Sequence, residues 1–306
     1  MINPFQVVIL GSGAALPTPK RAPSAQYIIC NNRHLLIDCG EGTQTQMRRF
    51  GVHFQKITQI FISHLHGDHY FGLIGLLSTM NLLGRNQGLT VYGPPELEAI
   101  LKMQFEVAYT PLNFQMQFVP LCSPQKDVIF EDKLVKVSAF PMKHRIKTFG
   151  FLIEEKGMEL MLNFSALSDA GVKKEFYRIL KLGNDIELLD GTLLRYADFT
   201  LPAPPPRSYA YCSDTAPFDN LFSFIKGTSV LYHEATFTNQ HKNRAKETAH
   251  STAEQAAKIA LMLGVKKLYL GHFSSRYSNG DEHLSEATAI FPNTVVVEDG
   301  SKFTVD

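Results

Sequence analysis

Apolar runs and stretches with a helical spacing of apolar residues alternate along this chain. The runs are rich in β-branched residues, which is typical of buried strands. A strand-rich series that is interrupted by helices indicates an α/β protein in which helices cover layered sheets. The strands expected on this ground are Gln6–Leu10, Tyr27–Cys30, His34–Asp38, Ile57–Ser63, Leu89–Tyr92, Leu134–Pro141, Phe149–Glu154, Tyr209–Cys212, Ser229–Tyr232 and Lys267–Leu270.

The helical stretches are longer than the strands, and one of them carries a start signal. Ser251 is followed three residues later by Glu254, which predicts a capping box. The helices expected are Gly42–Phe50, Tyr70–Leu83, one that opens at Pro94, and Thr252–Leu263.

Residues 155–206 interrupt this pattern between two strands that are expected to be neighbours. The segment contains a short helical stretch with four basic residues, and it returns through the proline-rich run 201–207. We expect an excursion from the core here, although an ordinary surface insertion would have the same pattern. The basic residues are Lys173, Lys174, Arg178 and Lys181.

Composition limits the classes of protein to which the chain can belong. Its 306 residues are 44% hydrophobic, which is enough for a sizeable core, and the formal net charge of +1 gives no global attraction to nucleic acid. No signal-peptide pattern and no apolar run of membrane-span length is present, so we expect a cytoplasmic protein without a membrane partner. The four cysteines lack paired spacing and are expected to be reduced core residues: Cys30, Cys39, Cys122 and Cys212.

The most informative motif is HLHGDH at residues 64–69, which follows an expected strand and precedes an expected helix. His64, His66, Asp68 and His69 combine imidazole with carboxylate, a donor set that suits zinc or a similar divalent ion. Four ligands so close together fit two ions more easily than one tetrahedral ion. Two ions need further ligands from distant parts of the chain, since the loop alone cannot complete both coordination shells.

Three distant residues can supply those ligands. His144, Asp214 and His272 each lie just past the end of an expected strand, and rigid strand ends are places where open sites are built. Other histidines stand apart from such patterns and are expected to have no special role: His34, His53, His241 and His283.

With these motifs the chain resembles the metallo-β-lactamase superfamily and, within it, the ribonuclease Z family of tRNA 3′-processing endonucleases. The HxHxDH loop marks only the superfamily, whereas the three motifs nearest the C-terminus are more specific to ribonuclease Z. The motifs that carry the resemblance are 11–17 (GSGAALP), 37–44 (IDCGEGTQ), 64–73 (HLHGDHYFGL), 233–237 (HEATF), 250–257 (HSTAEQAA) and 272–277 (HFSSRY).

The resemblance implies a four-layered αββα metallo-β-lactamase sandwich, one domain over residues 1–306 with a substrate-binding arm inserted at about 155–206. It also implies two divalent ions, zinc first and manganese as an alternative, with Asp214 bridging them. Two such ions with two ligand carboxylates leave about two positive charges, which suits a phosphodiester. The implied ligands are His64, His66 and His144 for one ion, and Asp68, His69 and His272 for the other.

The activity implied is removal of the 3′ trailer from precursor tRNA by metal-hydroxide attack, which leaves a 3′-hydroxyl on the tRNA. Asp68 would orient or deprotonate the water, and His250, held by Glu234, would protonate the leaving oxygen. The expected partners are precursor tRNA and a second copy of the chain in a homodimer. The remaining residues expected to bind substrate are Arg276, Lys173, Lys174 and Arg178.

One departure from the family keeps an alternative open. The arm of this family usually contains a Gly-Pro turn, whereas residues 171–177 read GVKKEFY. A phosphodiesterase of the same fold that acts on smaller substrates is therefore the alternative function. A metal-free RNA-binding protein would be a third reading, but the full set of seven ligands argues against it.

Overall fold

The structure, a computed structural model, describes residues 4–157 and 159–306 and divides the chain into two compact units. The larger unit comprises Met1–Glu154 and Arg207–Asp306, and the smaller one is Glu155–Pro206. All candidate ligands belong to the larger unit, whereas Lys173, Lys174 and Arg178 belong to the smaller one, here called the arm.

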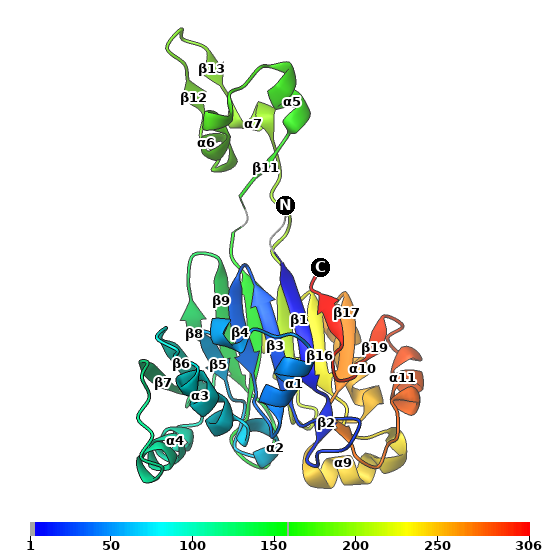
Figure 1. Cartoon of the computed structure of the whole chain (residues 1–306). Coiled ribbons are helices and arrows are strands. Elements are labelled where there is room, and N and C mark those ends of the chain that lie inside the picture. The colour runs from blue at the N-terminus through cyan, green and yellow to red at the C-terminus, as the bar shows by residue number, and fades with distance from the viewer. Residues whose placement is uncertain (1–3, 158) are drawn as a thin grey trace. The chain divides into compact units, whose positions relative to one another are not determined.

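Two seven-stranded sheets form the core of the larger unit (Figure 1). The first sheet has the order β20 (Lys302–Thr304), β1 (Phe5–Gly11), β3 (Ala25–Cys30), β4 (Arg33–Ile37), β5 (Gln59–Phe61), β6 (Leu89–Gly93) and β7 (Met116–Pro120). The second has the order β19 (Thr294–Val296), β17 (Lys267–Gly271), β16 (Val230–Glu234), β15 (Ser208–Cys212), β10 (Phe149–Glu155), β9 (Val135–Pro141) and β8 (Asp127–Glu131).

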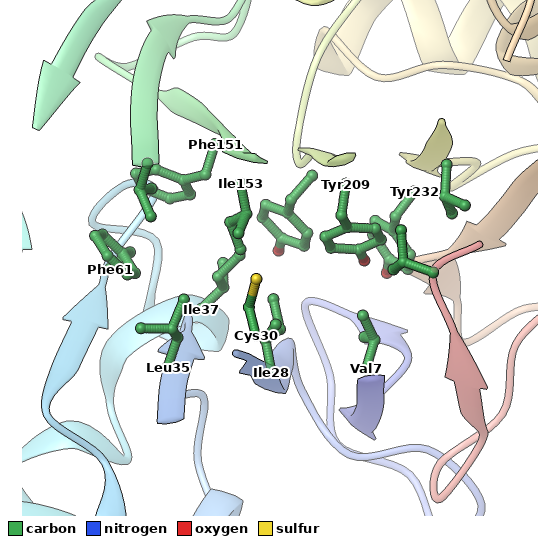
Figure 2. Close-up of a cluster of buried hydrophobic side chains, with 14 of the residues drawn as sticks. Val7, Ile28, Cys30, Leu35, Ile37, Phe61, Phe151, Ile153, Tyr209 and Tyr232 are labelled. Carbon is green, nitrogen blue, oxygen red and sulfur yellow. The ribbon is translucent and has the colours of Figure 1, made fainter. Parts of the chain in front are cut away.

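The two sheets face each other across a common apolar core. Leu35, Ile37 and Phe61 of the first sheet meet Phe151 and Ile153 of the second (Figure 2). Burial of such side chains is the main driving force for stacking the sheets. Because the inner faces are apolar along both sheets, the stack needs no other partner on that side.

Helices cover the outer face of each sheet, so the unit has the four expected layers. The first sheet packs against α1 (Thr43–Arg49), α3 (Leu73–Leu82) and α4 (Glu96–Val107) in a second apolar cluster. The second sheet packs against α8 (Leu221–Ile225), α10 (Ala253–Leu263) and α11 (Asp281–Thr288). The prediction of an αββα sandwich is confirmed.

Short elements connect these layers near the ends of the strands. They are β2 (Gly13–Ala14), which pairs with β18 (Phe273–Ser274), α2 (Gly67–Tyr70), α9 (Lys242–Thr248), and the 3₁₀ turns Phe54–Lys56 and Asn239–His241.

The arm has its own small core. Leu167, Val172, Leu180 and Leu194 are buried together in it. Its elements are β11 (Met161–Leu162), α5 (Phe164–Asp169), a 3₁₀ turn Lys174–Phe176, α6 (Tyr177–Lys181), β12 (Ile186–Glu187), β13 (Leu193–Leu194), α7 (Tyr196–Phe199) and β14 (Thr200–Leu201). The strands that flank the arm, β10 and β15, pair antiparallel as expected.

Two helix predictions need correction. The helix expected at Tyr70–Leu83 begins later, because Tyr70 is the last residue of α2 and α3 begins at Leu73. A Cβ at Gly72 would lie 2.1 Å from the carbonyl oxygen of Gly40, so the backbones of the two glycines are in direct contact between the two helices. The capping box of α10 consists of Thr252 and Gln255, not Ser251 and Glu254.

Ser251 does not cap α10 because its polar groups bind elsewhere. Its hydroxyl donates to the Thr215 carbonyl (2.7 Å) and its amide donates to Glu234 (3.0 Å), which ties the start of α10 to the neighbouring strand ends.

Burial corrects one further expectation. Cys30, Cys39 and Cys212 are buried, but Cys122 is exposed and is not a core residue. Within the described part of the chain, no helix is long and apolar enough to cross a bilayer.

Candidate dinuclear metal centre

The candidate site lies where the strands of both sheets end. In the second sheet, β15, β16 and β17 are parallel neighbours, so their carboxyl ends share one edge. Asp214 follows β15, Glu234 is the last residue of β16, and His272 directly follows β17. His144 follows β9 of the same sheet.

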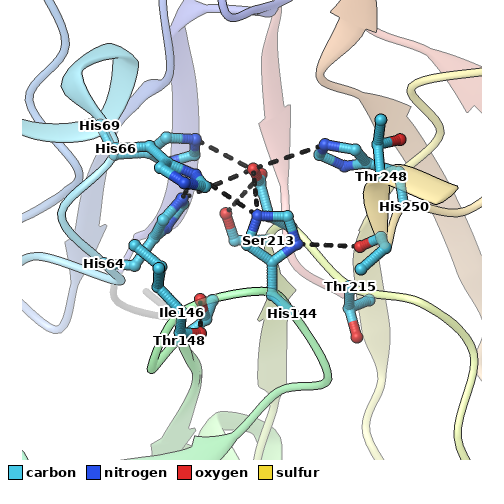
Figure 3. A network of polar contacts seen from close by, with 12 residues as sticks. His64, His66, His69, His144, Ile146, Thr148, Ser213, Thr215, Thr248 and His250 are labelled. Atoms are coloured by element: carbon cyan, nitrogen blue, oxygen red, sulfur yellow. Dashed lines mark hydrogen bonds and ion pairs between the residues drawn. The ribbon is translucent and has the colours of Figure 1, made fainter. Parts of the chain in front are cut away.

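The first sheet brings the histidine loop to the same place. The loop 64–69 follows β5 and continues into α2, so its side chains gather beside the strand ends. In Figure 3, His64, His66 and His69 lie on one side of the site, His250 lies on the opposite side, and His144 faces them from below.

Four donor atoms form a first group. His66 Nδ1 lies 3.0 Å from His64 Nε2 and 3.3 Å from His144 Nε2. Asp214 Oδ2 lies 3.5 Å from His64 Nε2 and 3.7 Å from His144 Nε2. Tetrahedral ligands with metal bonds of about 2.1 Å lie about 3.4 Å apart, so these atoms have the spacing of a coordination shell.

A second group has the same spacing and shares Asp214. His69 Nε2 lies 3.3 Å from His272 Nε2, 3.4 Å from Asp68 Oδ2 and 3.3 Å from Asp214 Oδ1. His272 Nε2 lies 3.5 Å from Asp68 Oδ2 and 3.1 Å from Asp214 Oδ1. The two oxygens of Asp214 thus belong to different groups, which is the arrangement of a bridging carboxylate.

Hydrogen bonds orient the histidines of both groups through Asp38. Asp38 Oδ2 accepts hydrogen bonds from His69 Nδ1 (2.8 Å) and from the Ser63 hydroxyl (2.9 Å). Because that hydroxyl donates to Asp38, it accepts from His64 Nδ1 at 3.0 Å. Both rings therefore carry their proton on Nδ1, and the lone pair of Nε2 points into the site.

Two more rings are oriented in the same way. His144 Nδ1 donates to the Ala249 carbonyl at 2.9 Å. The Thr236 hydroxyl donates to Glu234 Oε2 and so accepts from His272 Nδ1 at 2.9 Å. Five imidazole rings and two carboxylates converge within a few ångströms, a donor set that suits cations. The residues present fit two divalent ions.

The electrostatics of the buried rings agree with this fit. Burial lowers the pKa of His66 and of His144 to about 4, so both rings are neutral and able to act as ligands near neutral pH. Burial also opposes a charge on His69, but the carboxylates of Asp214, Asp68 and Asp38 outweigh it and raise its pKa well above the ordinary value. The second group thus favours additional positive charge.

Beside the two groups lies a carboxylate–imidazole pair. Glu234 is fully buried, and its Oε1 accepts from His250 Nδ1 at 2.9 Å. The opposite ring nitrogen, Nε2, lies 4.0 Å from Asp214 Oδ2 and so faces the ligands. Burial disfavours a charge on His250, but Glu234 and then Asp214 raise its pKa to about 9.

The groups open into a cavity of about 700 Å³. Arg145, Arg244 and Arg276 line it together with His66, Asp68, Asp214, His250 and His272. The guanidinium of Arg276 lies over the Phe237 ring and its Nε donates to Ser274, so its position is fixed. Three arginines around a cavity suit an anionic ligand.

The structure therefore brings together all seven expected ligands, in the two expected sets, with His250, Glu234 and Arg276 beside them. Their roles remain predictions. Sequence reasoning missed Arg145 and Arg244, and it gave no role to Asp38, Ser63 or Thr236. The signals that could have found two of them are motif positions, since Asp38 lies within the 37–44 motif and Thr236 within the 233–237 motif.

Two stacked sheets with a His- and Asp-rich site at the strand ends define the class of metallo-β-lactamase-fold hydrolases. Comparison with known proteins identifies the family. "Ribonuclease Z" of Parabacteroides distasonis is 40% identical over 301 residues, which is 98% of this chain and 99% of that one. "Ribonuclease Z" of Porphyromonas gingivalis W83 is 42% identical over 96% of this chain and 97% of its own. The chain belongs to the ribonuclease Z family.

Comparisons with solved structures and with family models give further similarities. The short form of human tRNase Z (ELAC1) is 29% identical with a TM-score of 0.71, and the match covers 98% of this chain and 99% of that one. YhfI of Bacillus subtilis, a metallo-β-lactamase fold protein, is 17% identical with a TM-score of 0.69 over 99% of this chain and 100% of its own, and it supports the fold alone. The model of the Anti-Pycsar protein Apyc1 matches residues 5–175, a range that excludes Asp214 and His272.

Proposed function

We propose that this protein is a metal-dependent endoribonuclease that removes the 3′ trailer from precursor tRNA and leaves a 3′-hydroxyl on the tRNA. The observation that carries the proposal is a pair of donor groups, His64–His66–His144–Asp214 and Asp68–His69–His272, with the His250–Glu234 pair beside them. Asp214 Oδ1 lies 3.3 Å from His69 Nε2 and 3.1 Å from His272 Nε2, so this carboxylate joins the two groups. Near-full-length relatives at about 40% identity carry the name ribonuclease Z. The arginines of the cavity suit a polyanionic substrate.

The first ion would be held by His64, His66, His144 and Asp214. The second would be held by Asp68, His69 and His272, with Asp214 as the shared ligand. The nitrogen-rich donor set favours Zn²⁺, with Mn²⁺ as the alternative. Two such ions would supply Lewis-acid activation of water and charge neutralisation at the phosphodiester.

The chain's own residues supply the proton transfers. His250 presents Nε2 to the cavity and donates the proton that the leaving 3′-oxygen of ribose needs. Glu234 accepts a hydrogen bond from Nδ1–H of His250 and so keeps a proton on Nδ1 and directs Nε2 toward the cavity. Asp68 Oδ2 is held by the Ala15 amide at 2.8 Å, which positions this carboxylate to orient the attacking water.

The test is cleavage of a precursor tRNA with a short 3′ trailer, with both new ends mapped. We expect a single cut at the tRNA–trailer junction, a 3′-hydroxyl on the tRNA and a 5′-phosphate on the trailer. An unstructured RNA of equal length is the control for substrate choice. Equal cleavage of both RNAs would contradict the tRNA assignment and leave the metal chemistry standing.

We propose further that the arm contacts tRNA phosphates through Lys173, Lys174 and Arg178. Lys173 lies 3.9 Å from Glu175, which weakens its attraction for phosphate, so Lys174 and Arg178 should contribute most. Replacing both with alanine should reduce the slope of log Kd against log salt by about 1.5. Glu187→Gln and Asp190→Asn on the same arm serve as controls that remove charge of the opposite sign. An unchanged slope would refute the contact.

A second candidate function is hydrolysis of smaller phosphodiesters by the same site. The arm without a Gly-Pro turn favours it. Bis(p-nitrophenyl) phosphate, assayed with the same preparation as the precursor tRNA, separates the two candidates. A kcat/KM for the small ester above that for precursor tRNA would favour the second candidate.

We also propose a homodimer in the cytoplasm. Met103 and Val107 on one face of α4 are exposed, as are Leu82 and Leu83 at the C-terminal end of α3, and exposed apolar groups of this kind mark protein contacts. All four cysteines are free thiols, which suits a reducing compartment. Val107→Lys should reduce the molar mass in light scattering from two chains to one. A wild-type protein of one chain would refute the dimer.

A further inference from the structure

An exposed aromatic ring lines the active-site cavity. It is neither a candidate metal ligand nor one of the groups proposed to transfer protons. Phe71 has 60% of its surface exposed although it lines the same cavity as Asp68 and His66. A large apolar side chain in contact with water and beside a polar site is informative, because burial would have been favourable.

The ring is held in place by its surroundings. A Cβ built on Gly67 would lie 2.2 Å from Phe71 Cε2, so the ring lies directly against the glycine. The Phe71 amide donates to the Gly67 carbonyl at 3.0 Å, and the Tyr70 ring meets Phe71 edge-on with centroids 5.0 Å apart. Gly67 and Tyr70 therefore pack against Phe71, while 60% of its surface stays exposed. Its position is set by the short helix α2, which carries Asp68 and ends directly before Phe71.

Phe71 follows Asp68 by three residues in the chain, and side chains at this spacing lie on the same side of a helical turn. Asp68 Oδ2 belongs to the second donor group, so a phosphodiester at that group has its neighbouring nucleotides within reach of the ring. An exposed aromatic side chain that is held in place is the usual platform for an unpaired base, because every base has a π-face.

We propose that Phe71 is a substrate-positioning residue that stacks on the base of a nucleotide flanking the scissile phosphate. This inference rests on the proposed function for its substrate, an RNA whose nucleotides are single-stranded at the cut. It assigns a task to Gly67 as well, since any side chain there would displace the ring. Stacking orients the sugar–phosphate backbone at the metal centre. It therefore raises kcat/KM by positioning the substrate and takes no part in protonating the leaving group.

The test is a double-mutant cycle between protein and RNA. Wild type, Phe71→Leu and Phe71→Trp are assayed for kcat/KM on a precursor with normal bases, and on two precursors with one abasic nucleotide on either side of the cut. Leucine keeps the apolar bulk but has no π-face, whereas tryptophan keeps a π-face. Phe222→Leu, on an exposed phenylalanine of α8 outside the cavity lining, is the matched control.

We expect Phe71→Leu to lose about tenfold or more in kcat/KM on the normal precursor, from the usual strength of base–aromatic stacking. Phe71→Trp should keep most of the activity. On one of the two abasic precursors the difference between wild type and Phe71→Leu should vanish, and that precursor identifies the stacked base. Equal effects of Phe71→Leu on all three precursors would overturn the proposal, as would tryptophan failing like leucine.

Failure of the proposed function is distinguishable from failure of this inference. If wild type does not cut precursor tRNA at the trailer junction, the same cycle is run on a short single-stranded RNA that it does cut. Metal content and thermal unfolding of each variant show whether a loss of kcat/KM reflects the missing Phe71 ring or a damaged metal centre.

Discussion

Asp38 is the buried residue that orients one histidine in each donor group, His69 directly and His64 through Ser63. Asp38→Asn is the change that tests this. The backbone of Asp38 has φ = 55°, a left-handed conformation that asparagine adopts more readily than most residues. The substitution therefore preserves shape and backbone while it removes the charge and one acceptor oxygen. Asp38→Ala would mix these effects with backbone strain.

The hydrogen bonds predict a cost in stability. Asp38 Oδ2 accepts from the hydroxyls of Tyr211 (2.7 Å) and Ser63 and from His69 Nδ1, and Oδ1 accepts from the Ser63 amide (2.7 Å). An asparagine must turn its NH₂ toward at least one of these donors. One buried donor left unsatisfied costs about 1–3 kcal/mol, and weaker bonds to a neutral oxygen add to that. We expect the metal-free protein to lose about 2–4 kcal/mol of unfolding free energy.

The effect on metal binding should differ between the two groups. His69 loses its direct partner, and changes to such outer partners typically weaken metal binding about 10- to 100-fold. His64 is held only through Ser63 and should lose less. Wild type should therefore bind two Zn²⁺ ions per chain, and Asp38→Asn should keep one tightly and one weakly in chelator competition.

Urea unfolding of the metal-free protein measures the first effect, and zinc stoichiometry at fixed free zinc measures the second. Asp132→Asn, a similar exchange far from the ligands that breaks an ion pair with Arg33, is the control. Wild-type affinity for both ions in Asp38→Asn would refute the reasoning, and so would an equal loss at both groups.

Three further variants test other parts of the site and of the fold. Asp68→Ala should abolish most turnover on any phosphodiester while circular dichroism of the folded protein stays unchanged; substantial activity would exclude its proposed role. His250→Ala should reduce precursor cleavage by about 10²–10⁴-fold but barely affect bis(p-nitrophenyl) phosphate, whose leaving group needs no proton; equal losses would make His250 structural. Burial lowers the pKa of His283 to about 4, so below about pH 6.5 the unfolded chain binds a proton that the folded protein does not. Stability should thus fall as pH falls from about 6.5 to 4, and His283→Phe should remove up to about 3 kcal/mol of that dependence in pH-dependent urea unfolding; an unchanged profile would contradict it.

The strands that could be predicted from sequence differ physically from those that could not. Every strand expected from the apolar runs is present, and each is an interior strand of one of the two sheets. The strands missed in the two large sheets are β7, β8, β19 and β20, which are the four edges. Edge strands expose part of their side chains, as β7 and β8 do, so their residues do not form the apolar runs that reveal interior strands.

The candidate ligands were predictable because metal chemistry restricts the residue type and strand ends restrict the place. The residues that orient them were not. Asp38, Ser63 and Thr236 are common polar residues, and only the register of neighbouring strands brings them within hydrogen-bonding distance of the histidines. Tyr211 reaches Asp38 from the opposite sheet, across 173 positions of sequence. No local pattern encodes such a contact, since it follows from how the two sheets stack.

The arm shows why a local motif and an overall charge can point in different directions. Residues 155–206 contain six Lys and Arg against eight Asp and Glu, so the arm as a whole should repel a polyanion. Its basic residues nevertheless concentrate around α6, whereas Asp185, Glu187 and Asp190 lie at the β12–β13 hairpin. Charges separated by more than about 8 Å are largely screened at physiological salt. Binding of phosphate at the arm therefore depends on the few cations around α6, and the acidic hairpin would restrict the orientation in which an RNA can approach.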